Sequence, residues 1–284
     1  MRLLGAGDNV VDRYVSLGRI FPGGNAVNVA VFASRLGADA AYLGNLGNDE
    51  AGQLVLKSLR HEGVQTDLVQ IVDGPNAYAE VRLVDRDRVF IGSDRGVANF
   101  DPTPEQLEAM SEFGVVHTAY SGSLGQYVPV MAERTKVSYD FAGRFTRESA
   151  WPMLPHLYLA TFSASDLSAE EASQLAADAV SAGAEYALAT RGGEGAYLAS
   201  PAGVLFQEAD KVVVRDTLGA GDAFIASVLV GLLSRRSLEE TLASASAHAA
   251  QVCMDYGAFG HGIDARADTT TTEEQVAQNK AGIK

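Results

Sequence analysis

One short stretch of the sequence combines a carboxylate with small residues that let a ligand approach the backbone. Residues 216–227 read DTLGAGDAFIAS, in which Asp222 follows Gly219, Ala220 and Gly221 and precedes the apolar run VLVGLL. A helix that begins at this turn leaves its first N–H groups without partners, and such groups attract anions such as phosphate. Beside a phosphate, Asp222 could act as a general base towards a hydroxyl. An acidic residue is also favourable in a first helical turn without any catalytic role, so both interpretations stay open.

The composition is that of a globular protein without a membrane span. The chain has 284 residues, 47% of them hydrophobic, and no apolar run approaches the ~20 residues of a transmembrane helix. Its net charge of −14 argues against nucleic acid or an anionic membrane as a partner, but it allows a small phosphate-bearing ligand. The start MRLLGAGDNVVD lacks the features of a signal peptide, and the single cysteine suits a reducing compartment. We therefore expect a cytoplasmic protein.

The hydrophobic pattern alternates between predicted strands and predicted helices. Strands are predicted at 1–9, 40–47, 114–121, 136–143, 156–163 and 211–217, with two strands around a glycine turn at 185–200. Helices are predicted at 25–37, 49–63, 168–183, 220–234 and 238–256. This alternation indicates a mostly parallel sheet with helices on both faces. Residues 77–93 differ, because they alternate around the turn DRDR and predict an exposed antiparallel hairpin beside the sheet.

The end of the chain has a different composition. Residues 1–260 contain no repeat and no low-complexity linker, and they are predicted to form one domain. After Gly260 the sequence becomes polar, as in DTTTTEEQVAQNK. We expect residues 261–284 to form a polar tail on the surface, with a helix docked on a neighbouring molecule as the alternative.

Two motifs together resemble the signatures of the ribokinase and phosphofructokinase-B family of carbohydrate kinases. DTLGAGDAF resembles the second signature, and PGGNAVNVAVFASRLGADAAYLGNLGNDEAG, residues 22–52, resembles the first. The resemblance covers residues 1–260. It implies a ribokinase-like three-layer α/β fold with a mostly parallel central sheet and a small β lid, and an enzyme that uses ATP and Mg²⁺. The lid would come from residues 9–22 and 73–95, and in many members it also makes a homodimer contact.

The resemblance also implies a role for individual residues. The catalytic base would be Asp222, and the anion hole would be formed by Gly219, Ala220 and Gly221. The sugar-binding residues would be Asp12, Gly24, Asn25 and Asn28. The residues near the nucleotide would be Thr190, Gly192, Gly195 and Ser246. From the residues alone, helix capping by Asn25 and Asn28 is favoured over sugar binding; the resemblance favours sugar binding, and Asn25 could do both.

Metal binding is the part in which the sequence departs from the family. Asp216 lies at the family's loop for a monovalent cation such as K⁺. An Asn-x-x-Glu motif often orders the water around magnesium, but the aligned segment here, residues 163–166, reads SASD. Asp166 would replace the glutamate, while the asparagine is missing.

The identity of the sugar rests on weaker features. The segments GDNVVD, GGNAVNVAV and DRVF resemble the corresponding segments of fructoselysine 6-kinases, a subgroup of the family. Another fructosamine, fructose, ribose or a nucleoside remains an alternative. Arg88, in the expected lid turn, could bind the carboxylate of fructoselysine, or it could be a solvated charge.

Other functional classes fit the sequence less well. The stretch LGAGDN has Val10 where a dinucleotide-binding fingerprint needs its third glycine. A non-catalytic sugar sensor would not need to keep Asp222 and its glycines. No structural zinc site is expected, since no ligand-like spacing relates the histidines, which are His61, His117, His156, His248 and His261.

Overall fold

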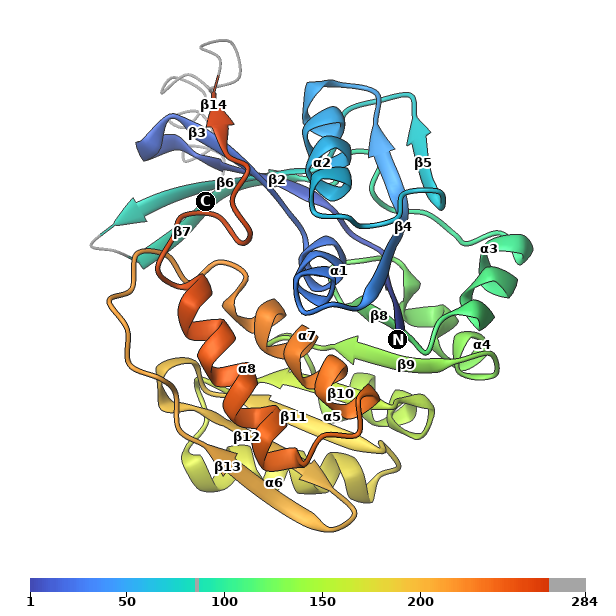
Figure 1. Cartoon of the computed structure of the whole chain (residues 1–284), viewed down its shortest axis with the longest axis vertical. Helices are drawn as coiled ribbons and strands as arrows, with labels where there is room; N and C mark the ends of the chain where they lie inside the picture. Colours follow the sequence, from blue (N-terminus) through green and yellow to red (C-terminus); the bar gives the residue numbers. More distant parts are fainter. Residues whose placement is uncertain (85–86, 266–284) are drawn as a thin grey trace, which may run out of the picture.

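The computed structural model describes residues 1–84 and 87–265, with side chains throughout except at residues 83–90, and it contains two sheets flanked by helices (Figure 1). The strands are β1 (Arg2–Ala6), β2 (Val10–Tyr14), β3 (Arg19–Gly23), β4 (Asp39–Gly47), β5 (Val69–Val72), β6 (Tyr78–Val84), β7 (Asp87–Asp94), β8 (Val115–Ala119), β9 (Lys136–Asp140), β10 (Leu159–Ser163), β11 (Tyr186–Thr190), β12 (Ala196–Ser200), β13 (Gly203–Gln207) and β14 (Ile263–Asp264). The α-helices are α1 (Asn25–Arg35), α2 (Glu50–His61), α3 (Pro104–Ala109), α4 (Val128–Ala132), α5 (Arg147–Ala150), α6 (Ala169–Ser181), α7 (Ala220–Leu233) and α8 (Leu238–Val252). Short 3₁₀ helices lie at Val15–Leu17, Met110–Glu112, Leu124–Tyr127, Trp151–His156 and Gly192–Glu194.

The central sheet is mostly parallel and is covered on both faces. Among the described residues its order is β13-β12-β11-β10-β9-β8-β1-β4-β5, and only the pairs β11–β12 and β12–β13 are antiparallel. Leu3 and Leu4, neighbours on β1, enter two different hydrophobic cores. One core contains residues of α1, α2, α7 and α8, and the other contains residues of α4, α5 and α6. The predicted three-layer α/β fold is therefore confirmed.

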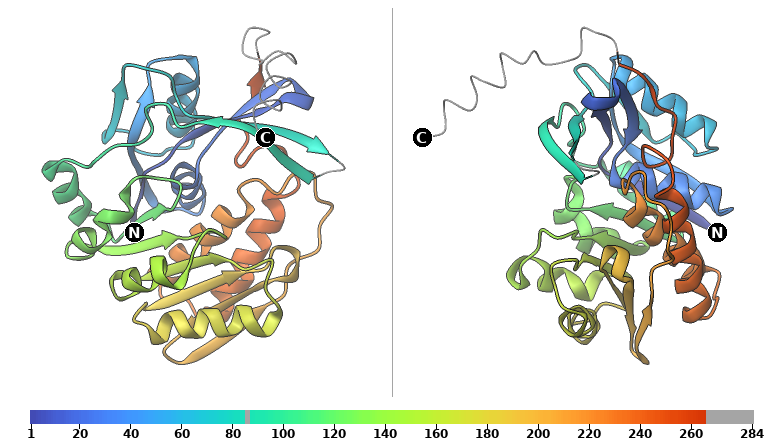
Figure 2. Two further views of the ribbon diagram at one scale, coloured as in Figure 1. Left: turned by 180° about the vertical axis from the view of Figure 1, so that it is seen from behind. Right: turned by 90° about the vertical axis from the view of Figure 1, so that its left-hand side faces the viewer.

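The second sheet forms a lid that projects from the body of the molecule (Figure 2). Its order is β14-β3-β2-β6-β7 among the described residues. The hairpin predicted at 77–93 provides β6 and β7, and β6 pairs in parallel with β2. A small core of its own, made of Tyr14, Phe21 and Val81, holds this sheet together.

One predicted strand is wrong. Residues 211–217 form no strand, and Val213 and Val214 are 85% and 47% exposed. Their β-branched side chains favour an extended chain, but none of the described strands pairs with them. The strand in this region is β13, which pairs with β12. The last predicted helix, 238–256, ends earlier, at Val252.

The chain returns to the lid after α8. β14, within the segment expected to be a polar tail, pairs with β3 through Ile263 and Ile20. Residues 266–284, the rest of that expected tail, lie outside the described residues. Across the part of the chain that the structure describes, no helix combines the length and apolarity that a membrane crossing requires.

Candidate active site

The carboxyl ends of neighbouring parallel strands gather polar residues at one edge of the central sheet. β1, β8, β9, β10 and β11 run in parallel, so the segments that follow them meet at this edge. Asp8 lies just after β1, Asp140 ends β9, and Thr190 ends β11. Open α/β sheets bind their ligands at such an edge.

The start of α7 leaves backbone N–H groups available for an anion. Gly219 precedes the helix with φ 77°, and a Cβ there would lie 2.5 Å from the Cβ of Ala258. The N–H groups of Gly219, Gly221 and Asp222 make no hydrogen bond to any described residue, and that of Ala220 makes one of 3.3 Å to Thr217. Gly221 is exposed, and a Cβ on it would meet nothing within 4 Å. A phosphate group can therefore approach this turn closely.

Two asparagines of α1 hold the carboxylate of Asp222. The amide of Asn25 donates to Oδ1 over 2.8 Å, and that of Asn28 donates to Oδ2 over 2.6 Å. Protein surrounds Asp222 on most sides, yet the residue keeps some solvent exposure. A carboxylate has about four lone-pair positions, so the two asparagines leave room for a substrate hydroxyl.

Asn25 links Asp222 to a second acid and to a buried histidine. Its Nδ2 also donates to Asp140 over 2.9 Å, so its Oδ1 must be the atom 2.7 Å from Nε2 of His117. An amide oxygen only accepts hydrogen bonds, and His117 therefore carries its proton on Nε2. Its Nδ1 then accepts from the hydroxyl of Ser138, 3.0 Å away. The hydrogen bonds from Ser138 to His117 and from His117 to Asn25 fix the orientation of the Asn25 amide.

The pKa values of these groups follow from their surroundings. Burial, and then the charges of Asp140 and Asp8, raise the pKa of Asp222 to about 7 against the lowering effect of its hydrogen bonds. Burial likewise raises the pKa of Asp140 to about 6. Burial lowers the pKa of His117 to about 3, so the ring is neutral. Asp222 thus titrates in the range in which a general base works best.

We expect His117 to act on Asp222 through Asn25. His117→Leu removes the donor to Asn25 and should lower kcat/KM about tenfold, the equivalent of one hydrogen bond of roughly 1.4 kcal/mol. His117→Gln, which can donate through its amide, should recover most of this loss. Steady-state kinetics give kcat/KM for both variants. Equal losses in the two would mean that His117 contributes packing and not a hydrogen bond to Asn25.

Helix capping, the alternative interpretation of the asparagines, is wrong for both residues. Asn25 is the first residue of α1, and Asn28 lies inside the helix. The cap is supplied by Asp8, whose carboxylate accepts from the N–H groups of Asn25 and Ala26, each over 3.1 Å. The side chains of both asparagines are thereby free to bind Asp222.

The other sugar-binding candidates lie where the lid meets α1. Asp12 is buried on β2, and its Oδ2 would lie 2.6 Å from a Cβ on Gly23, while Oδ1 of Asn28 would lie 3.7 Å from the same point. Gly24 has φ 109°, and a Cβ there would lie 2.6 Å from the Cα of Asn9. The side chain of Arg88, at the start of β7, lies outside the described part of the chain.

The nucleotide candidates lie in two groups. Thr190 ends β11, and the turn after it contains Gly192 and Gly195, both with positive φ. Ser246, on α8, donates to the carbonyl of Glu208 and accepts from the N–H of Asp210. Ser246 thus contacts residues 208–210, in the segment between β13 and α7.

The two metal candidates differ in how well they fit an ion. Asp166 is exposed just after β10, and Oγ of the adjacent Ser165 would lie 3.7 Å from a Cβ on Gly192. One exposed carboxylate suits Mg²⁺, which keeps most of its water. Asp216 is buried, and it already accepts hydrogen bonds from Tyr14, Gly257 and Leu218. These bonds occupy most of its lone-pair positions, and its role at a monovalent cation stays a prediction.

The sequence did not identify three residues of this site, namely Asp8, His117 and Asp140. Each lies within a predicted strand, where a polar residue that faces the interior costs free energy unless it has a partner. Their position near the carboxyl ends of predicted parallel strands was the feature of the sequence that could have indicated a role in the site. The contacts themselves join segments far apart in the chain, so spacing gave no indication of them.

Comparison with known proteins identifies the family of the chain. The family model described as pfkB family carbohydrate kinase matches residues 7–260. The chain belongs to this family. It is a carbohydrate kinase, and the family predicted from the two motifs is confirmed.

Individual members of the pfkB family are similar over most of their length. The fructosamine kinase FrlD of Bacillus subtilis is 36% identical over 280 residues, which are 97% of this chain and 99% of that protein. The fructoselysine 6-kinase of Escherichia coli K12 is 33% identical over 256 residues, 89% of this chain and 97% of that protein. Among solved structures, Arabidopsis thaliana ribokinase with ribose and ATP matches with a TM-score of 0.78, 20% identity and coverage of 98% and 97% of the two chains. That likeness supports the fold.

Proposed function

We propose that this pfkB-family kinase transfers the γ-phosphate of ATP to a primary hydroxyl of a fructosamine, with fructoselysine and its O6 as the first candidate. The observation that carries the proposal is the carboxylate of Asp222, which two amides hold at a helix start with available N–H groups. The names of the fructosamine and fructoselysine kinases at 33–36% identity support the choice of sugar.

The proposed mechanism uses the two functions of the α7 turn. Asn25 and Asn28 orient Asp222, which accepts the proton of the sugar hydroxyl as that oxygen attacks the γ-phosphate in line. The available N–H groups at residues 219–222 stabilise the charge that develops on the transferred group. Magnesium, which Asp166 would help to hold through water, would neutralise phosphate charge. The lid sheet, when it covers the sugar, excludes water and limits ATP hydrolysis.

A substrate panel tests this function. Release of ADP is measured with ATP and Mg²⁺ and with fructoselysine, a second fructosamine, fructose, ribose or adenosine. We expect the highest kcat/KM with fructoselysine or the other fructosamine. A preference for fructose, ribose or adenosine would keep the kinase and reject the proposed substrate class.

We expect Arg88 to distinguish sugars that carry a carboxylate. Arg88→Ala should raise KM for fructoselysine about tenfold, as for one lost charge-assisted hydrogen bond, and should leave KM for plain fructose unchanged. Arg82→Ala, at an exposed position on β6 of the same lid, is the control. Equal effects of Arg88→Ala on both sugars would exclude the contact with the carboxylate.

The pH profile should report the ionisation of the base. Because the base must be deprotonated, kcat/KM should be constant above the pKa of Asp222, about 7, and fall roughly tenfold per pH unit below it. Asp140→Asn removes a charge that raises this pKa, so the inflection should move to lower pH. A profile that is flat between pH 6 and 8 would contradict the assignment.

A further inference from the structure

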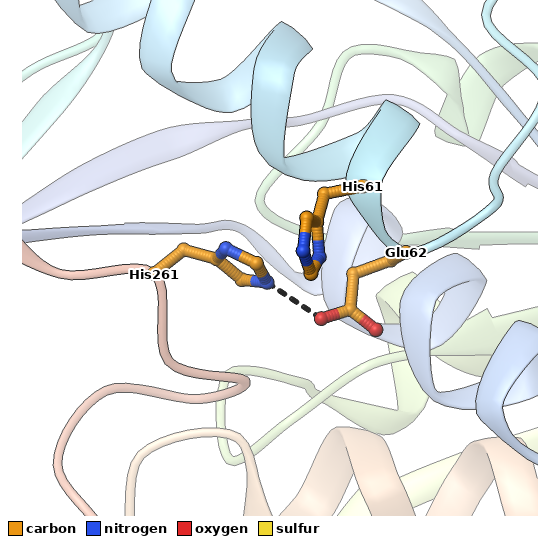
Figure 3. Close-up of side chains that lie close together, drawn as sticks. All are labelled: His61, Glu62 and His261. Atoms are coloured by element: carbon orange, nitrogen blue, oxygen red, sulfur yellow. Dashed lines mark hydrogen bonds and ion pairs between the residues drawn. The ribbon is translucent and has the colours of Figure 1, made fainter.

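Three side chains from distant parts of the sequence, residues 61, 62 and 261, meet on the surface next to the lid. His61 ends α2, Glu62 follows it, and His261 lies in the segment between α8 and β14 (Figure 3). Nε2 of His261 lies 2.6 Å from Oε1 of Glu62, and the two imidazole rings are 4.8 Å apart between centroids. The sequence showed no ligand-like spacing between these histidines, because the fold alone brings them together.

The cluster has the composition and dimensions of a metal site. One ligand atom from each of the three residues lies within 4.8 Å of the others. Around a tetrahedral ion with bonds of about 2.0–2.1 Å, ligand atoms are roughly 3.3 Å apart. Glu62 and His261 are already closer than this distance. His61 is exposed at a helix end and needs only a change of side-chain rotamer to approach them.

Arg35 supports the carboxylate as an outer-shell residue does. Its Nε and one terminal nitrogen donate to the two oxygens of Glu62 over 2.8 and 2.6 Å. Oε1 has lone pairs for both Arg35 and an ion. Hydrogen bonds to ligating carboxylates are a regular feature of metal sites.

His261 occupies its position at a conformational cost. Its φ is 59°, in the left-handed region that few residues other than glycine adopt, although histidine, like Asn and Asp, is found there more often than most. The residue lines a surface cavity of about 790 Å³ that also contains Arg35 and Phe259. An ion from solvent can therefore reach a ligand that the backbone already holds in place.

We propose that His61, Glu62 and His261 bind one transition-metal dication of the Zn²⁺, Co²⁺ or Ni²⁺ type. Two imidazole nitrogens and a carboxylate favour such ions over Mg²⁺, which prefers oxygen ligands. The ion takes the place of the proton between His261 and Glu62, and the neutral His261 ring keeps its proton on Nδ1. It fastens the segment 257–264 to α2, and this segment provides both β14 and the N–H of Gly257 that binds Asp216.

Metal binding by the untagged full chain tests the proposal. After treatment with a chelator and gel filtration, Zn²⁺ and Co²⁺ are titrated by calorimetry, and bound metal is counted by mass spectrometry. We expect about one ion per chain and a melting temperature raised by about 2 °C or more at saturation. His61→Ala, an exposed change, should weaken binding at least about tenfold, and Arg35→Gln should weaken it about 10–100-fold.

A matched histidine separates this site from weak surface binding. His156→Ala removes another exposed histidine far from the cluster in sequence and should leave the affinity unchanged. Hydrogen exchange at residues 257–264 should slow when metal is added to the wild type and not when it is added to His61→Ala. Absence of binding at 1:1 stoichiometry, or equal binding by wild type, His61→Ala and His261→Ala, would overturn the proposal.

Discussion

Asp222→Asn should lower kcat by at least about 10², because the variant cannot accept a proton from the sugar hydroxyl. The overall fold should persist, since asparagine has the same shape and the charge of one residue in a first helical turn contributes only about 0.3–1 kcal/mol. Steady-state kinetics with saturating ATP and sugar give kcat, and circular dichroism with a melting curve reports the fold. Near-wild-type turnover would exclude Asp222 as the base.

The control for this variant is an acid in the first turn of another helix. Glu239 is exposed in the first turn of α8, as Asp222 is in the first turn of α7. Glu239→Gln therefore removes an acidic group and its interaction with a helix dipole, away from Asn25 and Asn28. It should leave kcat unchanged. A loss of kcat as large as that in Asp222→Asn would mean that helix electrostatics, rather than proton transfer, explains the effect.

Substitution of the two glycines before Asp222 should separate folding from catalysis. Gly219→Ala puts a side chain at positive φ and against Ala258, and it should lower the free energy of unfolding by about 1–3 kcal/mol. Gly221→Ala meets no protein atom and should leave that free energy unchanged or raise it by up to about 1 kcal/mol.

Both glycine variants should nevertheless lose activity. The new methyl group of Gly221→Ala lies where the phosphate approaches, and a displacement on the order of 1 Å can cost about 10² in rate. We therefore expect Gly221→Ala to be stable and slow, and Gly219→Ala to be both unstable and slow. Urea unfolding and kcat are measured on the same preparations. A fully active Gly221→Ala would contradict the proposed phosphate position.

The local parts of this site could be predicted from the sequence, whereas its long-range contacts could not. The glycine turn before Asp222 and the helix after it follow from residue types within a few positions, and the structure has that helix at Ala220–Leu233. Asn25 could be identified as a candidate from the sequence, but the direction of its side-chain amide could not be predicted. Its amide is turned by His117 and Asp140, which lie on other strands.

The wrong strand and the unexpected metal cluster have a related cause. The run KVVVRDT has the residue types of a strand, but pairing needs a partner, and propensity does not show whether one is present. His61 and His261 are ordinary surface residues when each is considered with its neighbours in the sequence. Only the return of the chain to β3 after α8 brings them together.

The pairing of β14 with β3 also affects how the protein is made. Residues 19–20 are among the first to leave the ribosome, whereas residues 263–264 follow on the order of 10–50 s later at about 5–20 residues per second. During synthesis β3 therefore has an unpaired edge, and such edges promote association with other chains. Chaperone binding to a nascent chain should accordingly persist until synthesis has passed residue 264, after all the residues of the proposed active site have been made.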